Sequence, residues 1–194
     1  MSEAARQTRP TTLPVISDAE LVLRARDGDR GAQELLYQRY VRRVAGVVHR
    51  LLGSDRDLED LVQDTFIQAF DKLRTLSEPA AFGGWVLRLA TGKAVDRLRR
   101  RAMLRRIGLW SNESFDLDSL ISPRAPADVA LELRAVYQGI GKMPVDERVV
   151  LILRRVEELT HDEIAAQTGW SVATVKRRLS AAEARLAHVT EERR

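Results

Sequence analysis

Residues 159–179 combine turn, cap and charge signals that are typical of a helix-turn-helix that reads DNA. Thr160 and Glu163 have the spacing of a capping box, and Gly169 allows the positive φ that a sharp turn needs. Ser171 is a good N-cap for the second helix, whose N-terminal part enters the major groove in such motifs. An ordinary helical hairpin with a basic exposed face is the alternative interpretation.

The second helix of this motif separates an apolar side from a polar side. Val172, Val175 and Leu179 recur at i, i+3 and i+7, so we expect them to face the core, with Arg178 and its polar neighbours outward. Arg can bridge the edge of guanine, and Lys and Thr reach phosphates or bases. The candidate DNA contacts are Ser171, Ala173, Thr174, Lys176, Arg177 and Arg178.

A second basic surface is predicted between Arg88 and Arg106, where eight basic residues stand against one acidic residue, Asp96. A solvated helix face usually mixes both signs, so we favour a phosphate-binding surface over a merely soluble helix end. Aromatic residues precede this stretch and are more often core than base-stacking residues. The candidate DNA contacts here are Trp85, Arg88, Lys93, Arg97, Arg99, Arg100 and Arg101.

Two acidic stretches lie on either side of this basic run. Residues 55–64 and residues 111–132 each contain five acidic residues and a single arginine. A metal or acid–base site is not favoured, because no His, Lys or Gly-rich loop converges on them in the sequence. An acidic helix face is usually just solvated. A protein contact is the functional alternative, with Phe66 and Phe70 as apolar anchors on the same helix.

Composition excludes several classes of protein. The 194 residues carry a net charge of +4 and include no cysteine, which excludes disulfides, thiolate zinc sites and a cysteine nucleophile. The three histidines lack metal-ligand spacing, so we expect no metal and no cofactor. No nucleophile, base and orienting group come together, which argues against an enzyme. Neither a membrane-length apolar run nor a signal peptide is present, so the expected location is cytoplasmic.

The elements that must position these residues are predicted to be helices throughout. Apolar residues recur at helical spacing, and no strand-like alternation persists. Residues 107–127 contain Gly, Ser, Asn, Asp and two prolines, and their apolar residues have no sustained helical period, which is typical of a linker. The expected helices are 18–26, 30–52, 57–72, 79–101, 127–140, 144–156, 161–168 and 172–190. We therefore predict an all-α fold of two small helical domains, 17–105 and 127–190, joined by a flexible linker at 106–126, with a disordered arm at 1–16 and a tail at 191–194.

With these residues in place, the chain resembles an extracytoplasmic-function (ECF) sigma factor of the bacterial sigma-70 family. Residues 57–66 look like region 2.2 of that family, which binds the coiled coil of the largest polymerase subunit. Residues 82–101 look like regions 2.3 and 2.4, which melt and read the −10 promoter element. Residues 131–186 look like region 4, whose helix-turn-helix reads the −35 element. The resemblance implies a four-helix bundle for the first domain.

The resemblance also implies a function and partners. The chain would direct promoter-specific transcription initiation as a DNA-binding subunit of RNA polymerase, contacting the coiled coil and the flap of the core enzyme. Members of this group are commonly held inactive by an anti-sigma factor, which we therefore expect as a partner. The residues expected to bind core polymerase are Asp57, Leu58, Asp60, Leu61, Gln63, Asp64 and Phe66.

Two departures from the family pattern and two rival functions accompany this interpretation. Thr91 and Gly92 stand where the family often has Thr-Asn or Arg-Asn, which implies an altered −10 preference. Residues 73–79 lack the common Phe-Arg pair. The rivals are a stand-alone helix-turn-helix regulator and a sigma-like adaptor that binds proteins without initiating. The basic run at 88–106 argues against the first, because a sensor domain needs no second DNA surface.

Overall fold

The structure is a computed structural model that describes residues 16–54, 56–109, 121 and 124–191. Within these ranges the chain forms eight α-helices and two short 3-10 helices and contains no strand, which confirms the all-α fold class. The elements are α1 (Asp18–Arg26), α2 (Arg30–Leu52), α3 (Leu58–Asp71), η1 (Leu73–Thr75), η2 (Pro79–Ala81), α4 (Phe82–Arg106), α6 (Ala127–Lys142), α7 (Val145–Arg155), α8 (His161–Thr168) and α9 (Val172–Glu191).

Local capping residues set several of these helix ends. Thr160 completes the predicted capping box, because its Oγ1 accepts the N–H of Glu163 at 3.2 Å while its own N–H donates to the Glu163 carboxylate at 2.7 Å. Ser17 starts α1 by accepting the N–H of Glu20 at 3.2 Å. Gly53 ends α2 with a φ of 70°, the left-handed conformation that glycine adopts without strain. The predicted starts and ends at these positions are confirmed.

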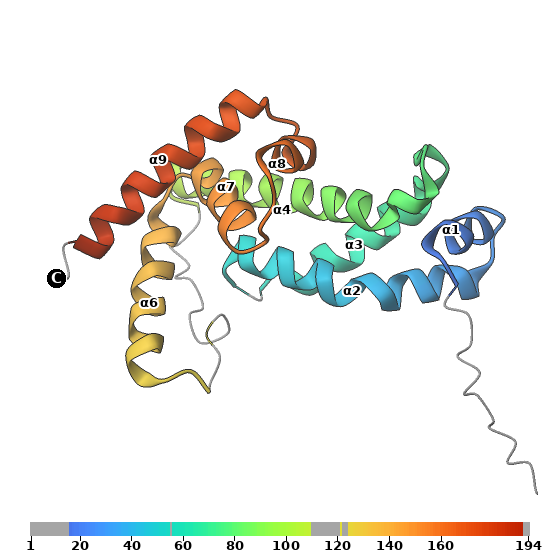
Figure 1. Cartoon of the computed structure of the whole chain (residues 1–194), viewed down its shortest axis with the longest axis horizontal. Coiled ribbons are helices and arrows are strands. Elements are labelled where there is room, and N and C mark those ends of the chain that lie inside the picture. The colour runs from blue at the N-terminus through green and yellow to red at the C-terminus, as the bar shows by residue number, and fades with distance from the viewer. Residues whose placement is uncertain (1–15, 55, 110–120, 122–123, 192–194) are drawn as a thin grey trace, which may run out of the picture.

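Helices α1 to α4 pack into one group, in which α2 and α4 run side by side and α3 packs against both (Figure 1). The start of α4 approaches α2 closely because Gly83 has no side chain: a Cβ there would lie 2.7 Å from the Tyr40 hydroxyl. Burial and a hydrogen bond to Asp18 raise the pKa of Tyr40 to about 12. The Tyr40 ring also stands edge-on to the fully buried Phe82, with centroids 5.5 Å apart.

The bounds of α4 differ from the prediction. The sequence places its start near Pro79 and its end near Arg101, whereas Pro79 opens the short helix η2 and α4 runs from Phe82 to Arg106. The end is longer because Arg101 turns inward: only 6% of the residue is exposed, and its guanidinium pairs with Asp57 at the start of α3. That contact holds α4 to the start of α3 at Arg101, while Met103, in the turn that follows, is 63% exposed.

Helices α6 to α9 form a second group. Helix α7 has a run of buried residues from Val149 to Leu153 and packs against α9. Helix α6 contacts α9, with Ile140 buried in its last turns. Its N-terminal half stands away from the other labelled helices in Figure 1, and Leu131 on that half is 64% exposed.

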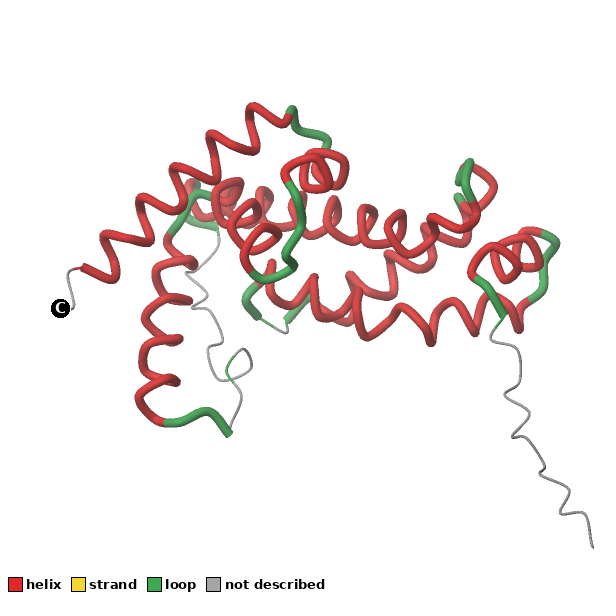
Figure 2. The backbone as a smooth tube through the Cα atoms, viewed as in Figure 1, coloured by secondary structure: helices red, strands yellow, loops and turns green. Residues whose placement is uncertain are grey.

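The two groups are packed against each other. Helix α4 contacts α7 and α8, and α2 contacts α7, so the buried residues of both groups form one continuous core. Figure 2 shows short loops joining consecutive helices within each group. The predicted linker is only partly described, since residues 110–120, 122 and 123 lie outside the described residues, as do the predicted arm up to residue 15 and the tail from 192.

Neither a membrane-spanning helix nor a metal-ligating cluster occurs in the described part of the chain. None of its helices has the length and apolar composition that crossing a membrane would require. No three His, Asp or Glu side chains in the described ranges come together as a metal-ligating group.

Candidate functional site

Helices α8 and α9 form the helix-turn-helix. The N–H of Gly169 donates to the carbonyl of Ala165 at 2.9 Å, and a φ of 73° at Gly169 turns the chain sharply out of α8. Ser171 then caps α9, because its Oγ accepts the N–H of Thr174 at 3.2 Å. Val175 is buried and anchors the first turns of α9 in the core. The turn, the cap and the buried side of the motif are as predicted.

The predicted DNA contacts of this motif divide into two sets. Ser171, Ala173, Lys176 and Arg177 are exposed on the first turns of α9, and Thr174 is half-buried against its contact with Ser171. The prediction that Arg178 points outward is wrong. Its guanidinium pairs with Asp146 of α7 at 2.6 Å and lies over the indole ring of Trp170, so the side chain turns inward and is only 23% exposed.

The predicted DNA contacts on α4 divide in the same way. Arg88, Arg99 and Arg100 are exposed, whereas Lys93 and Arg97 are half-buried. Trp85 is half-buried against Phe82, with ring centroids 6.1 Å apart, so it is part of the packing at the start of α4.

Asp57 forms ion pairs with two arginines of α4. It accepts Arg101 at 2.5 Å and Arg97 at 2.9 Å. Burial acts to raise the pKa of Asp57, but the hydrogen bond from Arg101 and the charges of both arginines outweigh it, so its pKa lies below the ordinary value. These contacts join the start of α3 to the end of α4. They give Asp57, which the sequence analysis grouped with polymerase contacts, a role in packing as well.

An apolar groove lies between α2 and α3, and we call it the α2–α3 groove. Neighbouring aromatic rings form part of it: Tyr37 stands edge-on to Phe66 with centroids 4.8 Å apart, and Phe70 is tilted against Phe66 with centroids 6.1 Å apart. Ile67 is 52% exposed on its wall. The groove is lined by Tyr37, Val41, Ala45, Leu58, Glu59, Val62, Gln63, Phe66, Ile67 and Phe70.

The structure brings some of the predicted polymerase contacts to this groove and leaves others outside it. Leu58, Gln63 and Phe66 line the groove, whereas Leu61 is buried and faces the core. Asp60 and Asp64 are exposed elsewhere on α3. The α2 side of the groove was missed from the sequence. Its residues, Tyr37, Val41 and Ala45, recur every four positions, and that spacing is the signal that would have found them.

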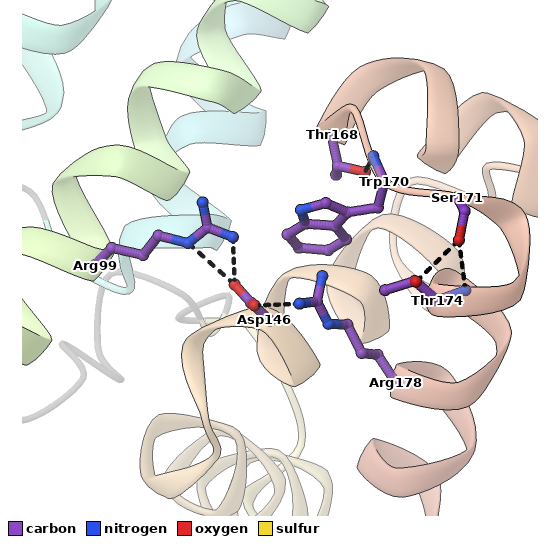
Figure 3. A network of polar contacts seen from close by, with 7 residues as sticks. All are labelled: Arg99, Asp146, Thr168, Trp170, Ser171, Thr174 and Arg178. Atoms are coloured by element: carbon purple, nitrogen blue, oxygen red, sulfur yellow. Dashed lines mark hydrogen bonds and ion pairs between the residues drawn. The ribbon is translucent and has the colours of Figure 1, made fainter.

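Among the described residues, polar contacts made by Arg99, Thr91 and Arg50 join the two groups of helices. Arg99 of α4 reaches Asp146 of α7, with Nη2 at 3.0 Å and Nε at 3.2 Å from the same carboxylate oxygen (Figure 3). The hydroxyl of buried Thr91 on α4 donates to Gln167 of α8 at 3.2 Å. Arg50 of α2 pairs with Glu157 after α7 at 2.5 Å. Arginine–carboxylate contacts of this kind were not predicted, because their partners lie 47 and 107 residues apart.

A buried arginine of α7 lies near basic residues of α4. Arg148 is buried, and that burial, helped by the charges of Arg105 and Arg101, lowers its pKa to about 10.

Gly92 stands at the position where the family resemblance leads one to expect Asn. A Cβ at Gly92 would have no described atom within 4 Å, so the packing of the described residues does not require glycine there.

Comparisons with known proteins match both groups of helices. Residues 36–103 match the family description "Sigma-70 region 2", and residues 133–186 match "Sigma-70, region 4". Among solved structures, CnrH in complex with the cytosolic domain of CnrY is similar with a TM-score of 0.63 and 26% identity, over 90% of this chain and 97% of that one. The sigma factor RpoE of Bartonella quintana, solved with the anti-sigma factor NepR, shares the fold with a TM-score of 0.62 and 20% identity, over 83% of this chain and 98% of that one.

Curated relatives agree with these matches over most of the chain. The ECF RNA polymerase sigma-E factor of Escherichia coli (strain K12) is 33% identical over 171 residues, which cover 84% of this chain and 89% of the relative. The protein of the same name from Haemophilus influenzae is 32% identical, with coverages of 84% and 90%. The chain belongs to the sigma-70 family of RNA polymerase sigma factors, in its ECF group.

Proposed function

We propose that three surfaces of this chain divide the work of a sigma factor. The α2–α3 groove binds core polymerase, α4 binds the −10 element and α9 binds the −35 element. The observation that carries this proposal is the groove, where a row of partly exposed apolar side chains from two helices lies beside an acidic helix start. Such a surface suits a helical partner that offers apolar and basic residues, as the coiled coil of the largest polymerase subunit would.

The proposed DNA contacts are predicted residues of α9 and α4 whose side chains are exposed or half-buried. On α9 they are Ser171, Ala173, Thr174, Lys176 and Arg177, with Arg178 joining them once its contact with Asp146 opens. On α4 they are Trp85, Arg88, Lys93, Arg97, Arg99 and Arg100. We leave Arg101 out, because its buried guanidinium is held by Asp57. Exposed arginines and lysines displace counterions from DNA phosphates, and that release favours binding.

We also propose the partners and the setting of the chain. Sigma factors leave the chemistry of RNA synthesis to the polymerase, so this chain needs no catalytic group of its own. Its work is with RNA polymerase and promoter DNA in the bacterial cytoplasm. Because RpoE of Bartonella quintana was solved with an anti-sigma factor, we propose such a partner here too.

Run-off transcription with core polymerase and a genomic promoter library tests the proposed function. We expect promoter-dependent transcripts only when both the chain and core polymerase are present. If the chain bound DNA tightly on its own but supported no such transcript, the sigma assignment would fail for this chain.

A matched pair of variants tests the α2–α3 groove. Ile67 on the groove wall is 52% exposed and Leu23 on α1 is 51% exposed outside it. We expect Ile67→Arg to weaken binding to core polymerase about tenfold or more, as removal of a central apolar anchor does. Leu23→Arg adds the same charge and should leave that affinity unchanged. Equal core affinities for the two variants would contradict the groove assignment.

A further inference from the structure

The carboxylate of Asp146 lies between arginines from the two groups of helices. Arg99 of α4 contacts its Oδ1 through two nitrogens, at 3.0 and 3.2 Å, and Arg178 of α9 contacts its Oδ2 at 2.6 Å (Figure 3). Asp146 is the second residue of α7 and its side chain is 27% exposed. One carboxylate at the end of one helix thus joins α4 to α9.

Trp170 adds a second link at the same place. Its ring lies 4.0 Å from the guanidinium carbon of Arg178 and 5.7 Å from that of Arg99. Both distances are within the range at which a cation is attracted to the face of an indole ring. Figure 3 shows the indole beside both guanidinium groups and the carboxylate. The two arginines therefore share both an anion and an aromatic ring.

The Asp146 carboxylate offers these arginines the same kind of anionic hydrogen-bond acceptor that a DNA phosphate offers. A guanidinium group binds the paired oxygens of a carboxylate or of a phosphate through the same N–H donors. Arg99 and Arg178 carry basic charge on the two helices proposed to bind DNA. While both donate to Asp146, the nitrogens that make these contacts are not free to meet a phosphate. Helix α8, the first helix of the motif, also packs against α4, where the hydroxyl of buried Thr91 donates to Gln167.

We propose that Asp146 is an internal competitor of promoter DNA. In the chain on its own, its carboxylate takes Arg99 and Arg178 and holds the helix-turn-helix on the DNA-binding side of α4. Opening this contact releases both arginines and separates the two DNA-binding helices. The proposal rests on the proposed function, because only that function makes α4 and α9 binding sites for DNA.

For this contact to act as a switch, the free energies of the closed and open forms must differ little enough for a partner to reverse their populations. In the ion pairs described between the groups, the side chains of Arg99 and Arg50 are 47% and 31% exposed, and in the pair that joins α9 to Asp146 the side chain of Arg178 is 23% exposed. Partly exposed ion pairs contribute modestly to stability. Core polymerase or the promoter can then supply the free energy of opening, and the loss of one link shifts the population toward the open form.

The test compares Asp146→Asn with Asp128→Asn. Both residues are the second residue of a helix, in α7 and α6 respectively, so both changes remove one charge from a helix start. The chain has no cysteine, so Arg42→Cys and Ser180→Cys, at exposed positions on α2 and α9, accept a pair of spin labels. The distances between the labels are measured by double electron–electron resonance without polymerase or DNA.

We expect Asp146→Asn to shift the label distances to longer values and Asp128→Asn to match the parent chain. We also expect Asp146→Asn to raise the affinity of the chain alone for a DNA duplex carrying its −35 element by about fivefold or more, measured by fluorescence anisotropy. Unchanged label distances and unchanged DNA affinity in Asp146→Asn would overturn the proposal.

A second variant keeps the test open if Asp146→Asn does not fold, as judged by circular dichroism. Glu157→Gln removes the pair with Arg50, which closes the same interface from the α2 side. It should lengthen the label distances and raise the DNA affinity in the same direction, and no change in either would contradict the proposal. Run-off transcription reports separately: a parent chain without promoter-dependent transcripts overturns the proposed function, whereas the label distances still decide whether Asp146 closes the chain.

Discussion

Helices α4 and α9 are both basic, but they use their basic residues differently. On α4, Arg97 and Arg101 end on Asp57, so part of its charge holds the helix to α3. On the first turns of α9, Lys176 and Arg177 are exposed. A count of basic residues therefore overestimates the surface that is available to DNA. On a helix that packs on several neighbours, arginines also serve as internal ion-pair partners.

The largest effect should come from removing an arginine that α4 uses internally. We expect Arg101→Ala to lower the free energy of unfolding by about 3 kcal/mol, because it leaves Asp57 partly buried with only one of its two ion-pair partners. Urea unfolding followed by circular dichroism measures this change. Arg88→Ala, an exposed position on the same helix, should stay within about 0.5 kcal/mol of the parent chain. Equal stabilities for the two variants would contradict the prediction that Arg101 stabilises the fold more than an exposed arginine of the same helix does.

The next effect concerns an exposed arginine of α9. We expect Arg177→Ala to weaken binding to the −35 duplex by about 1–3 kcal/mol if it contacts a base through two hydrogen bonds, with little change in stability. Arg185→Ala removes the same charge two turns further along α9, where Arg185 pairs with Glu147 at 2.8 Å. It should have the smaller effect on DNA affinity. If Arg185→Ala weakened DNA binding as much as Arg177→Ala, the assignment of the DNA contacts to the first turns of α9 would be contradicted.

The smallest effect should be an acid dependence of the contact that holds α4 to α3. Because the pKa of Asp57 is lower in the folded chain than its ordinary value of 3.8, Asp57 stabilises the fold fully above that value. The contribution is lost as the pH falls through the lowered pKa, and it is limited because burial opposes the arginines. The stability gap between the parent chain and Asp57→Asn should therefore shrink below about pH 4 in urea titrations. A gap that stayed constant from neutral pH to pH 3 would contradict this role.

Much of the helical framework was predictable because helix ends are decided locally. The capping box at Thr160 and the left-handed glycines at positions 53 and 169 act on backbone groups within one turn, so their residue types alone predict α2 and α8. The predicted end of α4 was wrong for the opposite reason. Arg101 does not end that helix but is buried within it, where it pairs with Asp57, 44 residues away in the sequence.

The sequence predicted the type of each binding surface, but not all of the residues that form it. The acidic start of α3 and its phenylalanines indicated a protein-binding surface, but Tyr37 and Val41 belong to a different helix and complete the groove only after α2 packs beside α3. The basic residues of the helix-turn-helix were found from spacing. The inward turn of Arg178 was not, since Asp146 stands 32 positions earlier in the sequence.

The sequence by itself determined that this chain is helical, where most of its helices begin and end, and that it carries the motifs of an ECF sigma factor. Those properties depend on hydrogen bonds and side-chain spacing within a few residues. Only the tertiary structure decided which arginines face solvent, which end on Asp57 or Asp146, and that the two groups of helices lie against each other. Such pairings depend on the distance in space between charges, and charges distant in sequence become neighbours only when the helices pack.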